Sequence, residues 1–155
     1  MEDLSIWRNV TTVNPPAVER WLEYMESGDS SILDGVLDDN VVFYSPAVFT
    51  PQNGRGKAGA YLKAAEQMFA TTNFEYVDQW VGQDSAILEF TAELDGTFIN
   101  GVDIIHWNAA QKIVSFKVLV RPLRALQSLV PKLATFLAST VSATTAPSVA
   151  SISTM

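Results

Sequence analysis

Four consecutive stretches of the chain carry the signals of β-strands, and they constrain the fold more than any other feature. They cover residues 74–81, 85–94, 97–107 and 112–120, with short polar segments between them. Asp95-Gly96 separates the second stretch from the third. Since Asp-Gly between two alternating runs is a strong hairpin signal, the sequence predicts a meander of antiparallel strands in this half of the chain.

Helices are predicted ahead of this meander. Pro16 opens the first helix, and a second short helix covers residues 31–37 before a strand over residues 41–45. A third helix is predicted over residues 57–69. Helices followed by a run of strands indicate an α+β fold. We expect a cone-shaped barrel, in which a curved antiparallel sheet wraps around the N-terminal helices and a C-terminal helix follows.

The end of the chain combines a helix with a low-complexity tail. The helix begins after Pro122, and Pro131 within it predicts a kink or a break. From Thr140 onward the composition is dominated by Ser, Thr, Ala, Val and Pro, without charge. Such a segment buries too little apolar area to order itself, so we predict one domain over residues 1–139 and a disordered tail over residues 140–155.

Composition excludes several classes of protein. With 17 acidic residues against 10 basic ones, a net charge of -7 and no basic run, the chain is not expected to bind nucleic acid. It has no cysteine, which excludes disulfides and zinc-thiolate sites. No apolar run reaches the roughly 18 residues of a membrane span, and no signal peptide is recognised, so a cytoplasmic protein is expected.

Asp103 is the strongest candidate for a functional residue. Strand alternation places it on one face with Ile105 and Trp107, and places Ile104 and His106 on the other face. A carboxylate among apolar side chains is costly to bury as an ion, so we expect its folded pKa to lie above the reference of about 3.9. Two interpretations remain open: a functional acid in a pocket, or a carboxylate tied to Trp, Tyr or Arg for structural reasons.

The inner faces of the strands and helices are almost entirely apolar. They describe either a solid core or an apolar pocket in which Asp103 is the polar group. The candidate substrate-binding residues are Trp21, Phe43, Ser45, Tyr61, Phe90, Trp107 and Phe116. His106 is the only histidine. A histidine-rich metal site therefore cannot be built, and no metal or organic cofactor is implied.

The order and spacing of several motifs resemble a known family. The matching segments are Trp21–Asp29, Leu37–Pro46, Gly54-Arg-Gly56 before a helix, Val102–Asn108 and Lys112–Phe116. They resemble the nuclear transport factor 2-like superfamily and, within it, the SnoaL-like polyketide cyclases and the relatives of ketosteroid isomerase. The likeness covers roughly residues 16–137. It implies a conical α+β barrel with an apolar pocket, in a group whose members include isomerases, cyclases, epoxide hydrolases and non-enzymatic binders.

The resemblance transfers only part of a catalytic site. The neutral carboxylic acid of ketosteroid isomerases falls on Asp103, their general base falls on Ser45, and their first-helix tyrosine falls on Trp21. Steroid isomerisation by that mechanism is therefore not expected. The Asp-Arg-Asp arrangement of the related epoxide hydrolases is also incomplete, because one inward Asp and no inward Arg are predicted. A SnoaL-like domain is the nearest type, since one acid can suffice there for an aldol-type cyclisation.

Two hypotheses on function follow. The first is a cofactor-independent enzyme of the cyclase or isomerase type, in which Asp103 is the general acid or base on an apolar carbonyl or polyketide-like small molecule. The second is a non-catalytic module of the same fold that binds an apolar ligand or dimerises. A homodimer through the outer sheet face is also predicted, because alternation places apolar residues there. The predicted apolar residues of that face are Ile87, Ile104, Ile113 and Leu119.

Overall fold

The computed structural model of the chain describes the backbone of residues 13–152 and the side chains of residues 13–139. The helices are α2 (Pro16–Ser27), α3 (Ser30–Val36), α4 (Arg55–Ala70) and α5 (Leu123–Ile152). The strands are β1 (Leu37–Tyr44), β2 (Gln52–Asn53), β3 (Glu75–Val81), β4 (Ser85–Leu94), β5 (Thr97–Trp107) and β6 (Ile113–Arg121). The predicted α+β order is confirmed, and β4 and β5 have the predicted bounds.

The strands form one curved, six-stranded sheet in the order β2-β1-β6-β5-β4-β3. Strands β3 to β6 are antiparallel neighbours, as predicted for the meander. The expectation of a wholly antiparallel sheet is wrong at one place, because β1 pairs with β6 in parallel. The connection from β1 to β6 passes through α4 and four strands, and a connection of that length leaves the strand direction free, unlike a hairpin.

The turn at Asp95 and Gly96 sets the register of the central hairpin. Both residues have positive φ, 50° and 78°, and Leu94 pairs with Thr97 across the turn. Positive φ at both central positions belongs to the type I′ turn, whose twist matches that of the two strands. From this turn the pairing runs without a shift to Ser85 and His106. The alternation of β5 therefore persists along the whole strand, and it carries Asp103 to the inner face.

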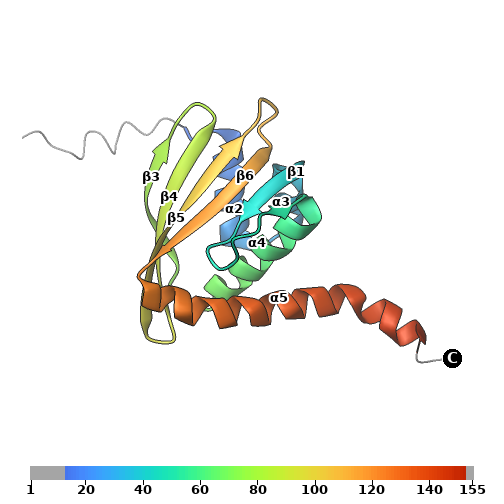
Figure 1. Cartoon of the computed structure of the whole chain (residues 1–155). Coiled ribbons are helices and arrows are strands. Elements are labelled where there is room, and N and C mark those ends of the chain that lie inside the picture. The colour runs from blue at the N-terminus through green and yellow to red at the C-terminus, as the bar shows by residue number, and fades with distance from the viewer. Residues whose placement is uncertain (1–12, 153–155) are drawn as a thin grey trace, which may run out of the picture.

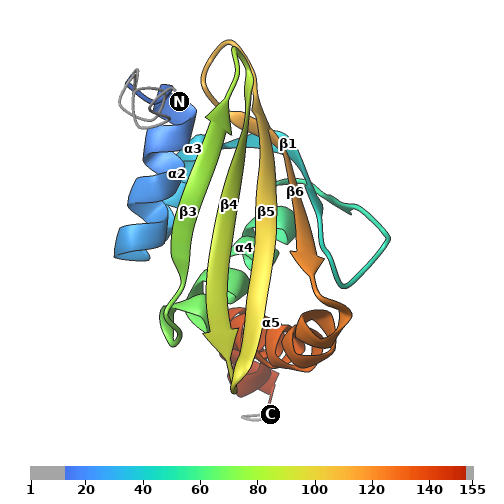
Figure 2. The same ribbon diagram turned by 90° about the vertical axis from the view of Figure 1, so that its left-hand side faces the viewer.

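Helices α2 and α4 lie against the concave face of the sheet, and α5 crosses one end of it (Figure 1). The convex face of β3 to β6 is not covered by any described element (Figure 2). Two clusters of buried apolar side chains fill the space between the layers. Tyr76 and Val118 pack against both clusters. The interior is thus one continuous layer, with these two residues at the junction of its halves.

Helix α5 runs through Pro131 without a break. The described part of the helix packs on the second cluster through Ala125, Leu129 and Leu133, which are buried. The prediction of a disordered tail over residues 140–155 falls on side chains outside the described residues, so it stays a prediction. Among the described residues no helix is long and apolar enough to cross a membrane.

A register shift near the start of β6 corrects one expectation. Ile113 pairs with Trp107 while Ser115 pairs with His106, so β6 carries one extra residue at this point. A bulge of this kind reverses the face on which the preceding residue lies. Ile113 is completely buried, and its predicted place on the outer face is wrong. Ile87 and Leu119 do lie on the outer face, where they are 37% and 50% exposed.

Gly101 lies where β5 is most crowded, and this gives a test of the packing. A β-carbon at Gly101 would stand 2.6 Å from the carbonyl oxygen of Leu119 and 2.6 Å from Cζ of the buried Phe90. Neither atom has room to move, so Gly101→Ala is expected to lower the free energy of unfolding by about 1–3 kcal/mol in chemical denaturation. Gly56→Ala in α4 is the matched control, because nothing lies within 4 Å of its added β-carbon. Equal denaturation midpoints for the two variants would contradict the observed packing.

Candidate functional site

Asp103 is the only charged residue that is buried among the described residues, with 5% of its surface exposed. It occupies the middle of β5, where its register partners are Leu88 on β4 and Val118 on β6. Strict alternation puts its side chain on the concave face and leaves His106 exposed on the other, as the sequence predicts. No Lys, Arg or His of the described chain forms an ion pair with Asp103. The carboxylate must therefore be accommodated by hydrogen bonds or by protonation.

A chain of two hydrogen bonds leads from helix α2 to Asp103. The indole Nε1 of Trp21 donates to Oη of Tyr76 over 2.9 Å. The hydroxyl of Tyr76 donates to Oδ2 of Asp103 over 2.5 Å. The three residues come from α2, β3 and β5, and the folded sheet alone brings them together. The second bond is short enough for a charge-assisted hydrogen bond, the strong class that forms between a hydroxyl and a carboxylate.

The second carboxylate oxygen of Asp103 faces open space. Among the residues that the structure describes, Tyr76 is the only hydrogen-bond partner of Asp103, and it contacts Oδ2. Within the described chain no fully buried side-chain oxygen lacks a partner. Oδ1 accepts no hydrogen bond from the protein, so it must be accessible from the cavity that Asp103 lines. One carboxylate oxygen, Oδ2, is therefore engaged by Tyr76, and the other, Oδ1, is available to a ligand.

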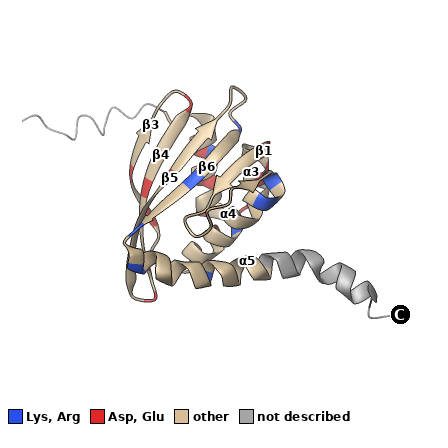
Figure 3. Ribbon diagram, viewed as in Figure 1, with Lys and Arg blue, Asp and Glu red and all other residues tan. Residues whose placement is uncertain are grey.

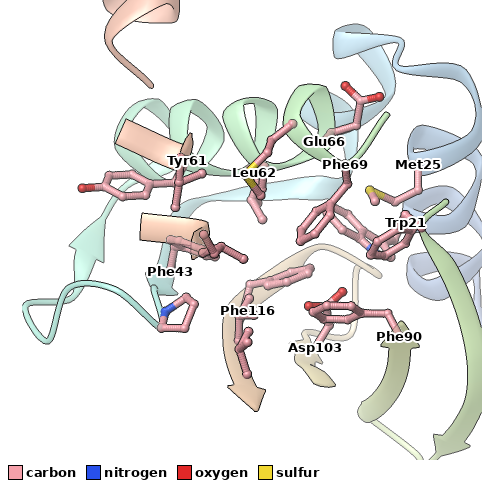
Figure 4. Close-up of a pocket in the computed structure, with 18 residues that line it drawn as sticks. Trp21, Met25, Phe43, Tyr61, Leu62, Glu66, Phe69, Phe90, Asp103 and Phe116 are labelled. Atoms are coloured by element: carbon pink, nitrogen blue, oxygen red, sulfur yellow. The ribbon is translucent and has the colours of Figure 1, made fainter. Parts of the chain in front are cut away.

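The cavity in front of Asp103 is narrow and almost wholly apolar (Figure 4). Its volume, counted as the space open to the centre of a water-sized sphere, is about 50 Å³. A cavity of about 150 Å³ holds benzene, whereas one water needs about 10–15 Å³. The space therefore accommodates a few waters or a small group. Its aromatic lining consists of Trp21, Phe43, Tyr61, Phe69, Phe74, Phe90 and Phe116.

Burial decides the protonation of this site. Desolvation raises the pKa of the Asp103 carboxyl from its ordinary value of 3.8 to about 7, although the hydrogen bond from Tyr76 works in the opposite direction. Desolvation also raises the pKa of the Tyr76 hydroxyl well above its ordinary value, and the charge of Asp103 adds to that effect. The expectation of a raised pKa at Asp103 is confirmed. A carboxyl with a pKa near neutrality can act as a general acid or as a general base.

Most of the sequence-predicted pocket residues line this cavity. Trp21, Phe43, Tyr61, Phe90 and Phe116 do so. Ser45 does not, because it lies beyond the end of β1 and its hydroxyl oxygen accepts from the backbone N–H of Ala47 over 3.0 Å. Trp107 is buried in the first apolar cluster without lining the cavity. Its place further along β5 separates it from the open oxygen of Asp103.

Tyr76 and Glu66 are the two polar residues of this region that sequence reasoning missed. The inward position of Tyr76 cannot be predicted from alternation, because β3 has a register shift. Val77 is an extra residue there, between the pairs Tyr76–Phe90 and Asp78–Glu89. Glu66 of α4 lines the cavity, and burial raises the pKa of its carboxyl. The Glu66 carboxylate is turned away from Asp103 towards α2 (Figure 4). Among the described residues no group of His, Asp and Glu is placed to hold a metal ion.

Comparison with known proteins identifies relatives of this arrangement. The family model described as SnoaL-like domain matches residues 18–116. The chain is similar to a steroid delta-isomerase from Pseudomonas aeruginosa, with 27% sequence identity and a TM-score of 0.78 over 85% of this chain and 99% of that one. An uncharacterised protein with a cystatin-like fold from Silicibacter pomeroyi has 27% identity and a TM-score of 0.72, over 77% of this chain and 84% of that one.

More distant structures share the fold alone. A putative polyketide cyclase from Sinorhizobium meliloti is 13% identical, with a TM-score of 0.56 over 68% of this chain and 94% of that one. A comparison with curated protein sequences found no match.

The raised pKa of Asp103 predicts how stability depends on pH. Below its unfolded pKa the group is neutral in both states and has no effect. As the pH rises from about 4 to about 7 the unfolded chain ionises first, so the folded state loses stability, on the order of 4 kcal/mol over this window at about 1.4 kcal/mol for each pKa unit. Asp103→Asn keeps an acceptor for Tyr76 and cannot ionise, so it is expected to exceed the wild type in stability above neutrality.

Denaturation midpoints across this pH range measure the effect. The difference between Asp103→Asn and the wild type isolates Asp103 from the other carboxylates. Asp84→Asn, which removes an exposed charge in the turn between β3 and β4, is the control. If Asp103→Asn were less stable than the wild type at every pH, Asp103 would be a structural acceptor that is ionised in the folded protein.

Proposed function

The chain belongs to the SnoaL-like family, with a nuclear transport factor 2-like fold, and on that premise we propose that it is a cofactor-independent enzyme of the cyclase or isomerase type. Asp103 is the general acid or base, and the substrate is a small apolar carbonyl or polyketide-like molecule. Trp21, Phe43, Phe90 and Phe116 form the walls that bind it. The observation that carries this proposal is the position of Oδ1 of Asp103, an ionisable oxygen open to an otherwise apolar cavity.

The chemistry follows from the two protonation states of Asp103. The neutral acid donates its proton, or a hydrogen bond, to a carbonyl oxygen and stabilises the negative charge that develops there. The carboxylate form takes a proton from the carbon beside the carbonyl. Since the pKa of Asp103 lies at about 7, both forms are present near neutral pH. Exclusion of water strengthens these interactions, because few other dipoles compete with them.

The site departs from the three-group site of acid, base and tyrosine that the resemblance to ketosteroid isomerases implies. Ser45, at the position of the general base, turns its hydroxyl to the backbone of Ala47. Trp21, at the position of the tyrosine donor, uses its single N–H on Tyr76. Neither group is available to a substrate, and the Glu66 carboxylate is turned away from Asp103 (Figure 4), so we assign the proton transfer to Asp103 alone. The similarity to a steroid delta-isomerase supports the class of reaction and not its substrate.

The volume of the cavity restricts what enters without rearrangement. A space of about 50 Å³ receives the reacting end of a ligand, and a larger molecule has to displace lining side chains. Met25 and Tyr61 are among the partly exposed members of the lining, and such residues can move more readily than the fully buried ones. The substrate is therefore expected to enter with its carbonyl first.

A non-catalytic role is the alternative, and one observation favours it. The hydrogen bonds from Trp21 to Tyr76 and from Tyr76 to Asp103 connect α2, β3 and β5, as a purely structural polar network would. Under this alternative the pocket holds an apolar ligand or stays closed. Activity that depends on Asp103 separates the two functions.

Proton exchange at carbon tests the proposed function without knowledge of the natural substrate. The probe is cyclopentanone in D₂O, and ¹H NMR follows the loss of its α-protons. The wild type is expected to accelerate the exchange over buffer, and Asp103→Asn to lose on the order of 10²–10⁴-fold of that acceleration, the usual contribution of one general acid or base. His106→Gln, on the exposed opposite face, is the control expected to match the wild type. Equal rates for the wild type and Asp103→Asn would favour the non-catalytic alternative.

We also propose that the protein is a homodimer through the convex face of the sheet. Trp80 is 53% exposed there and pairs with Ile87 of β4, and Leu119 of β6 lies further across the same face. Charged residues are scattered over the sheet (Figure 3). By register, those of the convex face include Glu75 on β3, Glu89 and Glu93 on β4 and Lys117 on β6. An apolar surface of this kind is typical of a subunit interface. The cytoplasmic location expected from the sequence stays a prediction.

Light scattering at micromolar concentration tests the dimer. The wild type is expected to have twice the mass of the chain, and Ile87→Lys to shift the population to monomer, because it places a charge in an apolar interface. Gln83→Lys adds the same charge in the exposed turn between β3 and β4, and it should remain dimeric. A monomeric wild type would contradict the proposal.

A further inference from the structure

The two hydrogen bonds that end at Asp103 have a defined direction. The indole of tryptophan is a donor only, so in the contact between Trp21 and Tyr76 the hydroxyl oxygen of Tyr76 must accept. Tyr76 has one hydroxyl hydrogen, and Oδ2 of Asp103 is the one acceptor recorded within reach of it. Tyr76 is partly exposed as a residue, but both partners of its hydroxyl, Trp21 and Asp103, are buried, so the hydroxyl itself lies inside the protein. The hydrogen of Tyr76 is therefore committed to Oδ2.

This direction decides where the proton of neutral Asp103 resides. If Oδ2 carried the proton, it would have to donate to Tyr76, and the hydroxyl hydrogen of Tyr76 would be left without an acceptor in a water-poor interior. A buried donor without a partner is unfavourable, so this arrangement is disfavoured. The remaining position is Oδ1, the oxygen that faces the cavity, where the proton can be donated to one of the few waters that the cavity accommodates.

We propose that Trp21 and Tyr76 are positioning residues that fix the ionisable proton of Asp103 on the oxygen facing the cavity. The inference rests on the proposed function for its catalytic meaning, but the location of the proton is a property of the protein by itself. Tyr76 does not line the cavity. The ring of Trp21 is part of the cavity wall, but its N–H acts on the reacting atoms only through Tyr76 and Asp103. Trp21 sets the direction of the two hydrogen bonds, because its indole can only donate, and Tyr76 therefore donates to Asp103.

The packing of Trp21 explains why the direction is stable. Its ring is 2% exposed, and it contacts the ring of Phe116 at a centroid distance of 4.5 Å and that of Tyr24 at 5.5 Å. These contacts from two sides hold the indole in one orientation, so Nε1 remains directed at Tyr76. Since the other carboxyl at the cavity, that of Glu66, is turned away from Asp103 (Figure 4), the placement of this one proton decides whether a ligand at Asp103 meets a donor or a bare carbonyl oxygen.

The C=O stretching band of neutral Asp103 tests the position of the proton directly. The band is measured by infrared spectroscopy at about pH 5, below the pKa of Asp103, and is identified by its absence from Asp103→Asn. With the proton on Oδ1, the carbonyl oxygen is Oδ2 and accepts from Tyr76. Tyr76→Phe then removes a hydrogen bond from the carbonyl, and the band is expected to move to higher frequency.

Trp21→Phe is expected to move the band in the same direction by a smaller amount, because Tyr76 keeps its hydroxyl but loses the donor that polarises it. Tyr24→Phe is the matched control, since it also removes a buried phenol hydroxyl next to Trp21, outside the hydrogen-bond chain.

An NMR titration of the Asp103 carboxyl gives a second measurement. Tyr76→Phe is expected to raise the pKa of Asp103, because the bond from Tyr76 favours the ionised form.

The outcomes separate this inference from the proposed function. A band that stays in place in Tyr76→Phe would overturn the inference, because a carbonyl at Oδ1 has no contact with Tyr76. A shift of equal size in Tyr24→Phe would also overturn it. Absence of ketone exchange in the wild type would instead count against the proposed function and leave the infrared result standing. Where exchange is observed, the inference requires its pH profile to move upward in Tyr76→Phe, in step with the pKa of Asp103.

Discussion

Burial of the Asp103 carboxyl among apolar side chains is the constraint around which the interior of this protein is arranged. An ion at this place would lose its hydration without gaining a cationic partner. Two features of the folded protein reduce this cost. The pKa of the group rises to about 7, and Tyr76 supplies a hydrogen bond to one of its oxygens. Both features require that β5 lies in the middle of the sheet and that β3 and α2 are packed beside it. The protonation state of Asp103 therefore depends on the arrangement of the sheet and of helix α2.

The sheet meets this requirement through local irregularities. The extra residue Val77 in β3 allows Gln79, which pairs with the inward Leu88, and Tyr76, which pairs with the inward Phe90, to lie on the same face. Strict alternation between these two positions would have placed Tyr76 outside, away from Asp103. Bulges of this type re-aim side chains near functional sites in many β-proteins. Here the bulge supplies the hydrogen-bond donor of the site.

Membership of the SnoaL-like family determines the shape of the interior more than it determines the chemistry. The fold provides a cone with an apolar inside, and the residues at the cavity decide what that inside can do. In this chain one carboxyl oxygen is open to the cavity, while Ser45 and Trp21 are engaged with the protein itself. The second carboxyl of the lining, that of Glu66, is turned away from Asp103 (Figure 4), so this site differs from sites that divide acid and base roles between two groups.

The sequence by itself determined the element order, the central hairpin and the inward position of Asp103, because these depend on local patterns. Alternation along residues 97–107 and the Asp95-Gly96 turn needed no knowledge of distant parts of the chain, and the structure agrees with both. The parallel pairing of β1 with β6 and the burial of Ile113 were decided by tertiary structure, since both depend on how segments far apart in the chain align. The same holds for Tyr76. Its approach to Asp103 depends on an extra residue in β3 that becomes visible only when the strand is paired with β4, and no periodicity within a single strand could reveal it.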